Sequence, residues 1–259
     1  MARGFTLIEL VMVIAITGTV AVGVSSFLGS VVGGYVDAAS RGRMAGVLVI
    51  ASEKISRDLR GALPNSIRVG GAGGNSCIEW LPIRRGGYYL SVPLATAANS
   101  FVAVSPGNSV ALTGRVVVYP VDTAALYSLG DSAPADVTSA IATLPAGTDE
   151  ITVTLGAPHQ FRLDSPGKRF FLIGEPVAYC FDSGANRIYR HTDYGFNPVP
   201  MLPPAGGRRD LLVTEVASLA FEFADSSRWR NAVVRISLAA AVGDESITLD
   251  QEAQVRNVP

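Results

Sequence analysis

The sequence predicts an α+β protein in which one long N-terminal helix packs on a mainly antiparallel, β-rich globular head. Three observations support this prediction. Residues 10–36 form an apolar run without a charged side chain. Apolar residues at helical spacing then continue through residue 63. Beyond residue 65, short apolar segments alternate with clusters of Gly, Pro, Asn and Asp, which is typical of strands joined by turns.

The N-terminal run is long enough to cross a membrane. About 20 apolar residues, each rising roughly 1.5 Å along a helix, span a hydrocarbon core. One carboxylate, Glu9, stands at the start of this run, and the next charged residue is Asp37. Because a charge is costly in a membrane, Glu9 indicates a functional role that involves a partner.

The helical spacing after the run has an apolar side and a basic side. The apolar side consists of Met44, Val47, Leu48, Ala51, Ile55, Leu59 and Leu63, and the basic side of Arg43, Lys54, Arg57 and Arg60. We expect the apolar side to pack on the head and the helix to end at Pro64-Asn65. Residues 31–35 indicate either a flexible junction or a continuous helix.

The rest of the chain is expected to form strands in one or two sheets. The strand candidates are 66–69, 77–83, 88–90, 115–121, 150–155, 170–173, 176–181, 187–191, 211–214, 219–223, 233–239 and 246–255. We expect one hairpin that turns at Gly86-Gly87 and another that turns at 182–186. Residues 122–147 favour an irregular excursion with a helical turn, and 197–209 favour a loop.

Composition and motifs give no sign of an enzyme. The net charge is −1 and the pI about 6.1, so there is no general basic footprint for nucleic acid. The sequence has no nucleophile elbow, zinc-binding helix motif, paired Cys-x-x-Cys or phosphate loop. We therefore predict no catalytic residue, no metal and no cofactor. His159 and His191 stand in unrelated contexts, and we interpret His191-Thr192-Asp193 as a surface turn rather than a base or a metal site.

Two further features have a functional and a structural interpretation. Glu79 beside Trp80 suits either an acid of raised pKa or, as we favour, a solvent-facing residue of an alternating strand. Two basic-aromatic sets suit either nucleic acid or glycan binding or Arg packing over rings within the sheets. These sets are Arg84-Arg85 with Tyr88-Tyr89, and Arg208-Arg209 with Trp229-Arg230.

Three interpretations compete for the N-terminal segment. A secretory signal peptide expects an apolar stretch of about 7–15 residues and a small-residue cleavage site, and neither is found here. A plain membrane anchor leaves Glu9 unexplained. The third rests on Met1-Ala2-Arg3-Gly4, Phe5 and Glu9, which resemble a type IV prepilin signal. In that signal a short basic leader ends in Gly, Phe follows, and Glu is fifth in the mature chain.

The resemblance implies a processing pathway and a membrane position. Prepilin peptidase would cleave between Gly4 and Phe5 on the cytoplasmic side and methylate the new amine of Phe5. Residues 1–4 would be the leader, 5–28 the transmembrane and assembly helix, 29–64 the periplasmic half of the helix, and 65–259 the periplasmic head. The chain would be a single-pass inner-membrane protein that later joins a pilus or pseudopilus. Its partners would be other pilin subunits, with Glu9 facing a neighbour's Phe5 amine.

One departure from that family concerns the helix. Many major pilins carry a Pro about two-thirds along the apolar run, where this chain has Ser25-Ser26. Glycines within the run also loosen a helix, by roughly 1 kcal/mol each relative to Ala. Whether the helix stays straight is therefore open at this stage.

Segments further along the chain are similar to the O-type minor pilins of mannose-sensitive haemagglutinin (MSHA) pilus systems. These segments are 35–37, 56–68, 77–82 and 178–181. The resemblance implies a minor pilin that takes part in pilus assembly. J-type pseudopilins of type II secretion and W-type minor pilins of type IVa pili share the same plan. A J-type pseudopilin and a tip-displayed module that binds DNA or glycan therefore stay as alternatives.

The same resemblance places the two cysteines, Cys77 and Cys180, in an oxidising compartment. An even number of cysteines there favours a disulfide. Two buried free thiols are the alternative.

Overall fold

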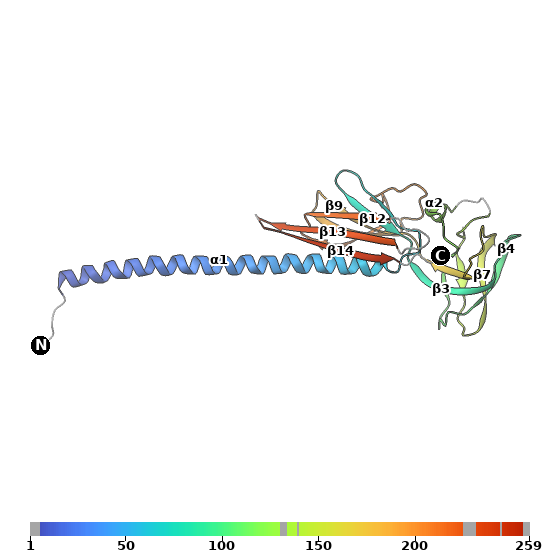
Figure 1. The fold of residues 1–259 in the computed structure, drawn as a ribbon, viewed down its shortest axis with the longest axis horizontal. Coiled ribbons are helices and arrows are strands. Elements are labelled where there is room, and N and C mark those ends of the chain that lie inside the picture. The colour runs from blue at the N-terminus through green and yellow to red at the C-terminus, as the bar shows by residue number, and fades with distance from the viewer. Residues whose placement is uncertain (1–5, 130–133, 139, 225–231, 244, 256–259) are drawn as a thin grey trace.

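The computed structural model describes residues 6–129, 134–138, 140–224, 232–243 and 245–255. Over these residues the protein has the α+β fold that the sequence predicts, with the long helix α1 (Leu7–Leu59) leading into a β-rich head (Figure 1). Helix α1 is continuous through Ser25-Ser26 and through residues 31–35, so the junction is helical. Its N-terminal half projects away from the head as a free rod.

Helix α1 ends at Leu59, before the proline at which the sequence analysis ended it. The reason is that the next residues already pair with another segment. The backbone N–H of Leu63 donates to the carbonyl oxygen of Leu81 at 2.8 Å, and that of Ile83 donates to Gly61 at 2.9 Å. A helix continuing to Pro64 would lose these bonds.

The described residues of the head contain one short helix and fourteen strands. In chain order these are β1 (Arg68–Gly70), β2 (Ser76–Trp80), β3 (Ile83–Ser91), β4 (Ala98–Val104), β5 (Leu112–Val118), α2 (Thr123–Tyr127), β6 (Ala142–Leu144), β7 (Glu150–His159), β8 (Arg169–Ile173), β9 (Val177–Asp182), β10 (Arg187–Thr192), β11 (Arg208–Thr214), β12 (Ser218–Ala224), β13 (Ala232–Val242) and β14 (Glu245–Val255).

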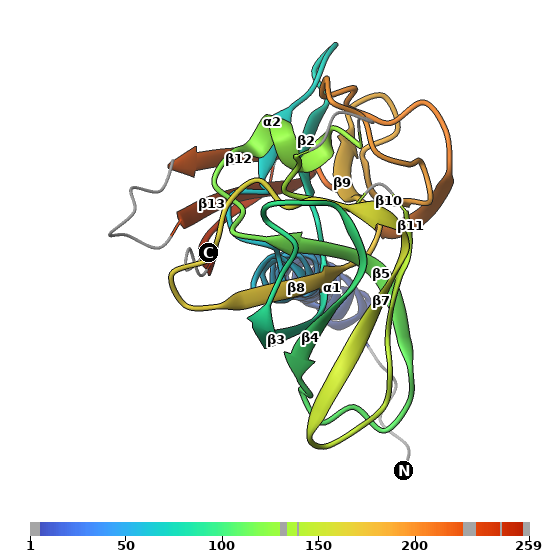
Figure 2. The same cartoon turned by 90° about the vertical axis from the view of Figure 1, so that its right-hand side faces the viewer.

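Within the described residues, the strands form a five-stranded sheet (β1-β2-β9-β10-β11), a three-stranded sheet (β12-β13-β14) and a closed barrel (β3-β4-β7-β6-β5-β8). The pairings between named strands are antiparallel. The barrel lies at the end of the head farthest from the N-terminus (Figure 1), and Figure 2 looks onto it with α1 end-on behind. The sequence analysis expected one or two sheets, missed β4 and assigned the residues of β6 to an irregular excursion, so it did not foresee the barrel. The helical turn that it expected in that excursion is α2.

The predicted hairpin at Gly86-Gly87 is wrong, because both glycines lie inside β3. Strands β2 and β3 belong to different sheets, and the chain crosses between them at Leu81 and Pro82. The glycines serve packing rather than a turn, since a Cβ at Gly87 would lie 2.8 Å from the Phe170 ring. The second predicted hairpin, β9 to β10, is confirmed.

The main core lies between α1, the three-stranded sheet and the five-stranded sheet. The C-terminal half of α1 contributes the apolar side that the sequence predicts, through Met44, Leu48, Ala51, Ile55 and Leu59. Along β13, buried side chains alternate with more exposed ones, as expected for a sheet that is covered on one face. The buried residues are Ala232, Val234, Ile236, Leu238 and Ala240. The first helix and the last two strands of the chain thus close the same core.

A second core fills the barrel, and a third cluster joins the barrel to the rest of the head. In the third cluster, Leu126 and Tyr127 of α2 pack with Leu63 and Leu81, which follow α1 and β2, and with Ile173 of β8. The barrel is therefore fixed to the main core through packed side chains.

Candidate functional site

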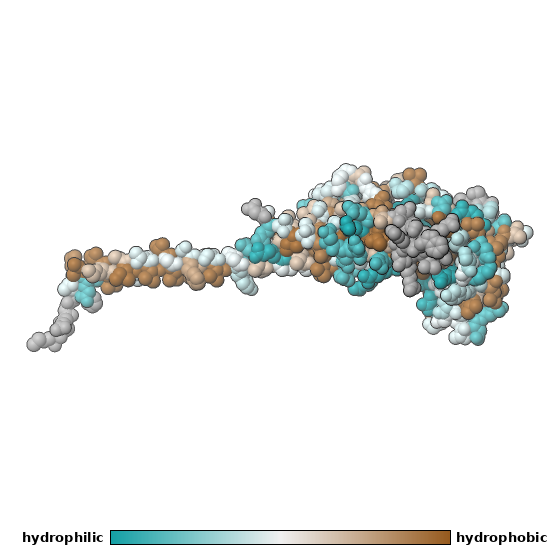
Figure 3. All heavy atoms as spheres, in the orientation of Figure 1, coloured by the Kyte–Doolittle hydropathy of each residue, from teal (hydrophilic) through white to brown (hydrophobic). Residues whose placement is uncertain are grey.

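The N-terminal half of α1 is the candidate assembly site. Its large apolar side chains from Leu7 to Val36 are about half exposed or more, and Leu7 reaches 82%. Figure 3 shows this rod as mostly apolar, in contrast to the mixed surface of the head. Helix α1 is, among the described residues, the one helix long and apolar enough to cross a membrane. A surface of this kind is stable only where lipid or other helices cover it.

Glu9 lies in the first turn of α1. The backbone N–H groups of Glu9 and Leu10 donate to the carbonyl oxygen of Thr6. A carboxylate in this position is favoured by the helix dipole, and no described cation pairs with it. Gly4 and Phe5, the predicted cleavage and methylation residues, lie outside the described residues.

Ion pairs hold α1 to the head where the helix leaves it. The Arg41 guanidinium contacts Glu245 of β14 at 2.6 Å, and Arg43 contacts Glu215 at 3.3 Å. Deeper in the head, the Tyr179 hydroxyl donates to the carboxylate of Asp58 at 2.8 Å. The direction of the rod relative to the head is thus set mainly by the core, and these polar contacts add to it.

Cys77 and Cys180 form a disulfide in this structure. They stand directly opposite each other on β2 and β9, and both are buried. Their surroundings include Tyr194 and Leu202 of the long segment between β10 and β11.

Glu79 is buried, so the interpretation as a solvent-facing residue is wrong. It forms an ion pair with the guanidinium of Arg68, which lies opposite it on β1, and its other oxygen accepts from the Tyr194 hydroxyl at 2.9 Å. The Arg68 guanidinium also lies 3.4 Å from the centre of the Tyr127 ring. Burial and the nearby Glu79 carboxylate raise the pKa values of Tyr194 and Tyr127.

The sequence analysis missed this buried polar cluster, although a signal was present. Arg68 and Glu79 flank the glycine-rich residues 70–74 at positions that face each other if the two flanks pair. An opposite-charge pair across a short loop of this kind is a sign of cross-strand pairing.

Both histidines are also buried, so the surface-turn interpretation of His191 is wrong. His191 lies within β10, and His159 ends β7 with its ring 4.5 Å from that of Phe161. Burial lowers the pKa of each imidazole. Among the described residues, no group of three or more His, Cys, Asp or Glu side chains is arranged to hold a metal ion.

Among the described members of the two basic-aromatic sets, the structural interpretation applies, because cations pack over aromatic rings. Arg209 on β11 lies 3.5 Å from the Tyr189 ring centre and pairs with Asp182 at 2.7 Å, so packing accounts for it. The Arg169 guanidinium carbon lies 6.0 Å from the centre of the Tyr88 ring. The Lys168 Nζ lies 5.6 Å from the centre of the Tyr89 ring. Arg84 and Arg85 lie on β3, and Trp229-Arg230 fall outside the described residues.

Comparison with known proteins finds one match. Residues 1–25 match the family model described as the prokaryotic N-terminal methylation motif. No curated protein and no solved structure matches the chain. The motif indicates a structural subunit rather than an enzyme, and together with one N-terminal apolar helix it fits a protein anchored in the inner membrane by a single span. The methylation motif, the long apolar helix and the antiparallel head together support a type IV pilin-like protein that is processed by prepilin peptidase.

Proposed function

We propose that the protein is an O-type minor pilin of an MSHA-like type IV pilus, cleaved between Gly4 and Phe5 and methylated on the Phe5 amine. Helix α1 is the observation that carries this proposal. It starts within the matched motif, and its apolar N-terminal half is exposed and bears one carboxylate, that of Glu9. Lipid covers this surface while the subunit waits in the inner membrane with its head in the periplasm. Equivalent helices of neighbouring subunits cover it after assembly.

Glu9 sets the register of that assembly. A carboxylate surrounded by apolar helices costs several kcal/mol unless a cation pairs with it. Cleavage creates such a cation at the Phe5 amine, and the amine of a neighbouring subunit satisfies Glu9 only when the two helices are in the correct register. Residues 10–36 carry no other charged side chain. The pair of Glu9 and the Phe5 amine is therefore the charged interaction that can align the apolar helices of two neighbouring subunits.

Two features of the head support the assignment as an O-type minor subunit. The closed barrel extends the head beyond the α1 core, and such bulk is easier to place at an end of a filament than within a helical shaft. The segments 56–68, 77–82 and 178–181, which resemble O-type subunits, meet around β1, β2, β9 and the disulfide. These three segments therefore belong to one part of the structure, while the fourth resembling segment, 35–37, lies on α1.

The intact mass of the membrane-extracted protein tests the processing. In cells with active prepilin peptidase we expect loss of residues 1–4 and gain of one methyl group. In cells without it we expect the full-length, unmethylated chain. A full-length chain in both strains would show a plain membrane anchor, and the proposal would fall.

A deletion strain then tests the apparatus. We expect loss of the subunit to reduce surface pili while protein secretion continues. Loss of type II secretion with normal piliation would identify a J-type pseudopilin instead. Photo-crosslinking from residues in the exposed half of α1 would identify the neighbouring subunits in either case.

A further inference from the structure

A proline-rich segment lies between β10 and β11. This segment, residues 194–207 and termed the strap, has four prolines and no charged side chain. Its side chains Tyr194 and Leu202 pack on a buried cluster of Cys77, Ala178 and Cys180. These three residues alternate along β2 and β9 with residues of the main core, so the strap covers the face of the five-stranded sheet that is turned away from that core.

The buried ion pair of Arg68 and Glu79 holds the first half of the strap. The Arg68 Nη1 donates to the carbonyl oxygens of Asn197 and Pro198, at 2.9 and 3.1 Å. The Glu79 carboxylate accepts from the Tyr194 hydroxyl at 2.9 Å. Because the two charged side chains are almost fully buried, water competes little for these bonds. The polar cluster inside the head therefore fixes a segment on its surface.

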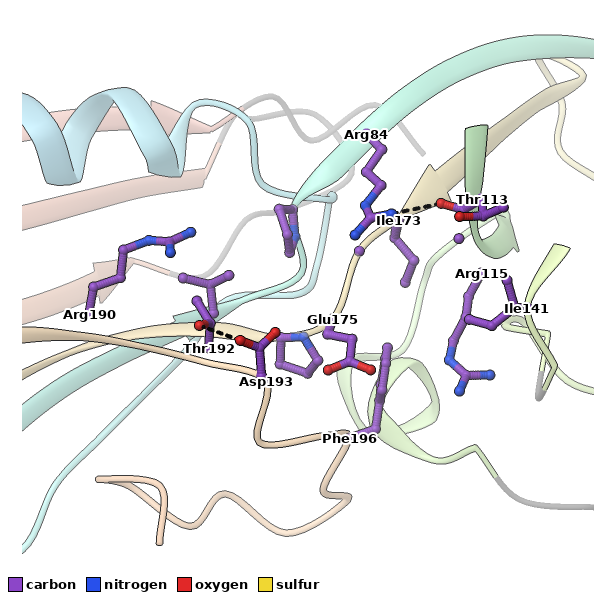
Figure 4. A pocket seen from close by; sticks show the side chains of 15 residues that line it. Arg84, Thr113, Arg115, Ile141, Ile173, Glu175, Arg190, Thr192, Asp193 and Phe196 are labelled. Atoms are coloured by element: carbon purple, nitrogen blue, oxygen red, sulfur yellow. Dashed lines mark hydrogen bonds between the residues drawn. The ribbon is translucent and has the colours of Figure 1, made fainter. Parts of the chain in front are cut away.

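Two apolar side chains fix the strap on either side of that contact. The Phe196 ring centre lies 6.5 Å from that of Tyr127, and the Arg115 guanidinium carbon lies 5.2 Å from it (Figure 4). Leu202 lies over Gly70, where an added Cβ would be 3.4 Å from the leucine Cδ1 atom. The backbone is thus held before residue 199 and again at residue 202.

Residues 199–201, the tip of the strap, project an apolar surface between these anchors. Val199 and Met201 are 68% and 55% exposed, and Val199 is the most exposed large apolar side chain of the described head. Pro200 between them is exposed as well. No described group donates to the carbonyl oxygens of residues 199–201. The tip therefore offers apolar side chains and unused backbone acceptors from a fixed position.

The chemistry of the tip argues against several classes of partner. Nucleic acid and anionic lipid are bound through cations, and the strap has no cation. The hydroxyl groups of a sugar use donors as well as acceptors, and the four prolines of the strap have no N–H group.

A protein groove lined by aromatic rings has the complementary chemistry. Such grooves bind proline-rich segments, because the rings pack on the proline side chains and the segment loses little entropy on binding. Methionine sulfur also makes favourable contacts with aromatic rings. Tryptophan N–H and tyrosine O–H groups supply donors for the backbone carbonyl oxygens.

We propose that the tip of the strap docks into an aromatic-lined groove of another protein, with Val199, Pro200 and Met201 as the contact residues. The anchors hold the segment in one shape before the encounter, which lowers the entropy that binding costs. The strap packs on β2 and β9 of the head, so this contact is separate from the packing between N-terminal helices.

The test is photo-crosslinking in cells that produce the full-length protein. A photoreactive phenylalanine analogue replaces Ala205, an exposed strap residue outside the tip, or, in a parallel strain, Val110, an exposed residue between β4 and β5. We expect a protein adduct from position 205 that position 110 does not give. Mass spectrometry should place this adduct beside aromatic residues of the partner.

Variants of the chain with the probe at position 205 then test the tip and its anchors. Val199→Ser/Met201→Ser should lower the adduct yield about tenfold or more, because the apolar contact is lost. Val110→Ser is the matched control, since it removes an exposed apolar side chain elsewhere on the head. Leu202→Ala keeps the tip but removes an anchor, and it should lower the yield several-fold. An unchanged urea midpoint of the double variant, expected for exposed residues, shows that the head stays folded.

Four results would overturn the proposal. They are no protein adduct specific to position 205, adducts with lipid or glycan alone, equal adduct yields from Val199→Ser/Met201→Ser and Val110→Ser, and an adduct on a partner segment without aromatic residues. The second would indicate a membrane or polysaccharide surface, and the third would indicate that the tip takes no part in the contact.

Discussion

Replacing Glu79 by Leu is expected to destabilise the head by about 3–5 kcal/mol, because it leaves a buried guanidinium without its counter-charge. The side chains of Arg68 and Glu79 are only 7% and 3% exposed, so solvent cannot take the place of the lost partner. The Tyr194 hydroxyl would lose its acceptor in the same variant. For a head of this size, such a loss corresponds to a fall in melting temperature of roughly 10 °C.

The double variant Arg68→Met/Glu79→Leu separates the charge effect from the packing effect. It removes both charges and keeps similar volume, and exchanges of this kind are often close to neutral. We expect a cost of about 1–3 kcal/mol from the polar groups left without partners, among them the carbonyl oxygens of Asn197 and Pro198. The double variant should therefore be more stable than Glu79→Leu alone.

Urea unfolding of the full-length protein in detergent, followed by tryptophan fluorescence, measures these differences. Trp80 is adjacent to Glu79 and fully buried, so its emission should report unfolding of this core. The matched control is Glu222→Leu, whose carboxylate is exposed and forms a surface pair with Arg235 among the described residues. A loss below 1 kcal/mol for Glu79→Leu, or a double variant less stable than that single variant, would refute this account of the buried pair.

Three further predictions concern the disulfide, the helix and pH. Replacing Cys77 and Cys180 by Ser should reduce the free energy of unfolding by up to about 4–5 kcal/mol, since the bond closes a separation of 103 residues; equal stability of the variant and the oxidised protein would contradict this. Glu9→Val should leave the amount of subunit in the membrane unchanged but impair its recovery in sheared pili, and full incorporation would disprove the pairing role. Because burial lowers the pKa values of His159 and His191 below the ordinary 6.5, the unfolded state protonates first, so stability should fall as pH drops from 7 to 5. The variant His159→Gln/His191→Gln should show a weaker decline, and an unchanged slope would show that other groups dominate.

The parts of the fold that follow from local periodicity could be predicted from the sequence. The apolar side of α1 from Met44 to Leu59 packs as its spacing indicates, and the hairpin between β9 and β10 forms at the Asp- and Gly-containing turn. The motif at residues 1–25 is likewise local, which is why the resemblance and the family match agree on it. In each case the signal lies within one short window of the chain.

The features that were missed depend on contacts between distant segments. Gly86-Gly87 has the composition of a turn, but the need for space beside Phe170 across the barrel decides its conformation. The sequence around Glu79 favours a surface position, because its partners Arg68 and Tyr194 contact it only in the folded protein. Arg84 is the additional residue of a bulge in β3 against β8, and no local sequence pattern encodes this bulge.

The near-parallel course of α1 and the long strands β13 and β14 has a mechanical consequence (Figure 1). A pull along the exposed end of α1 would load the contact with these strands in shear, so that the buried side chains between Met44 and Leu59 resist together rather than one after another. The pairs of Arg41 and Arg43 with Glu245 and Glu215 lie at the point where the load enters the head. The head is thus arranged to transmit axial tension from the helix to its sheets without peeling away from it.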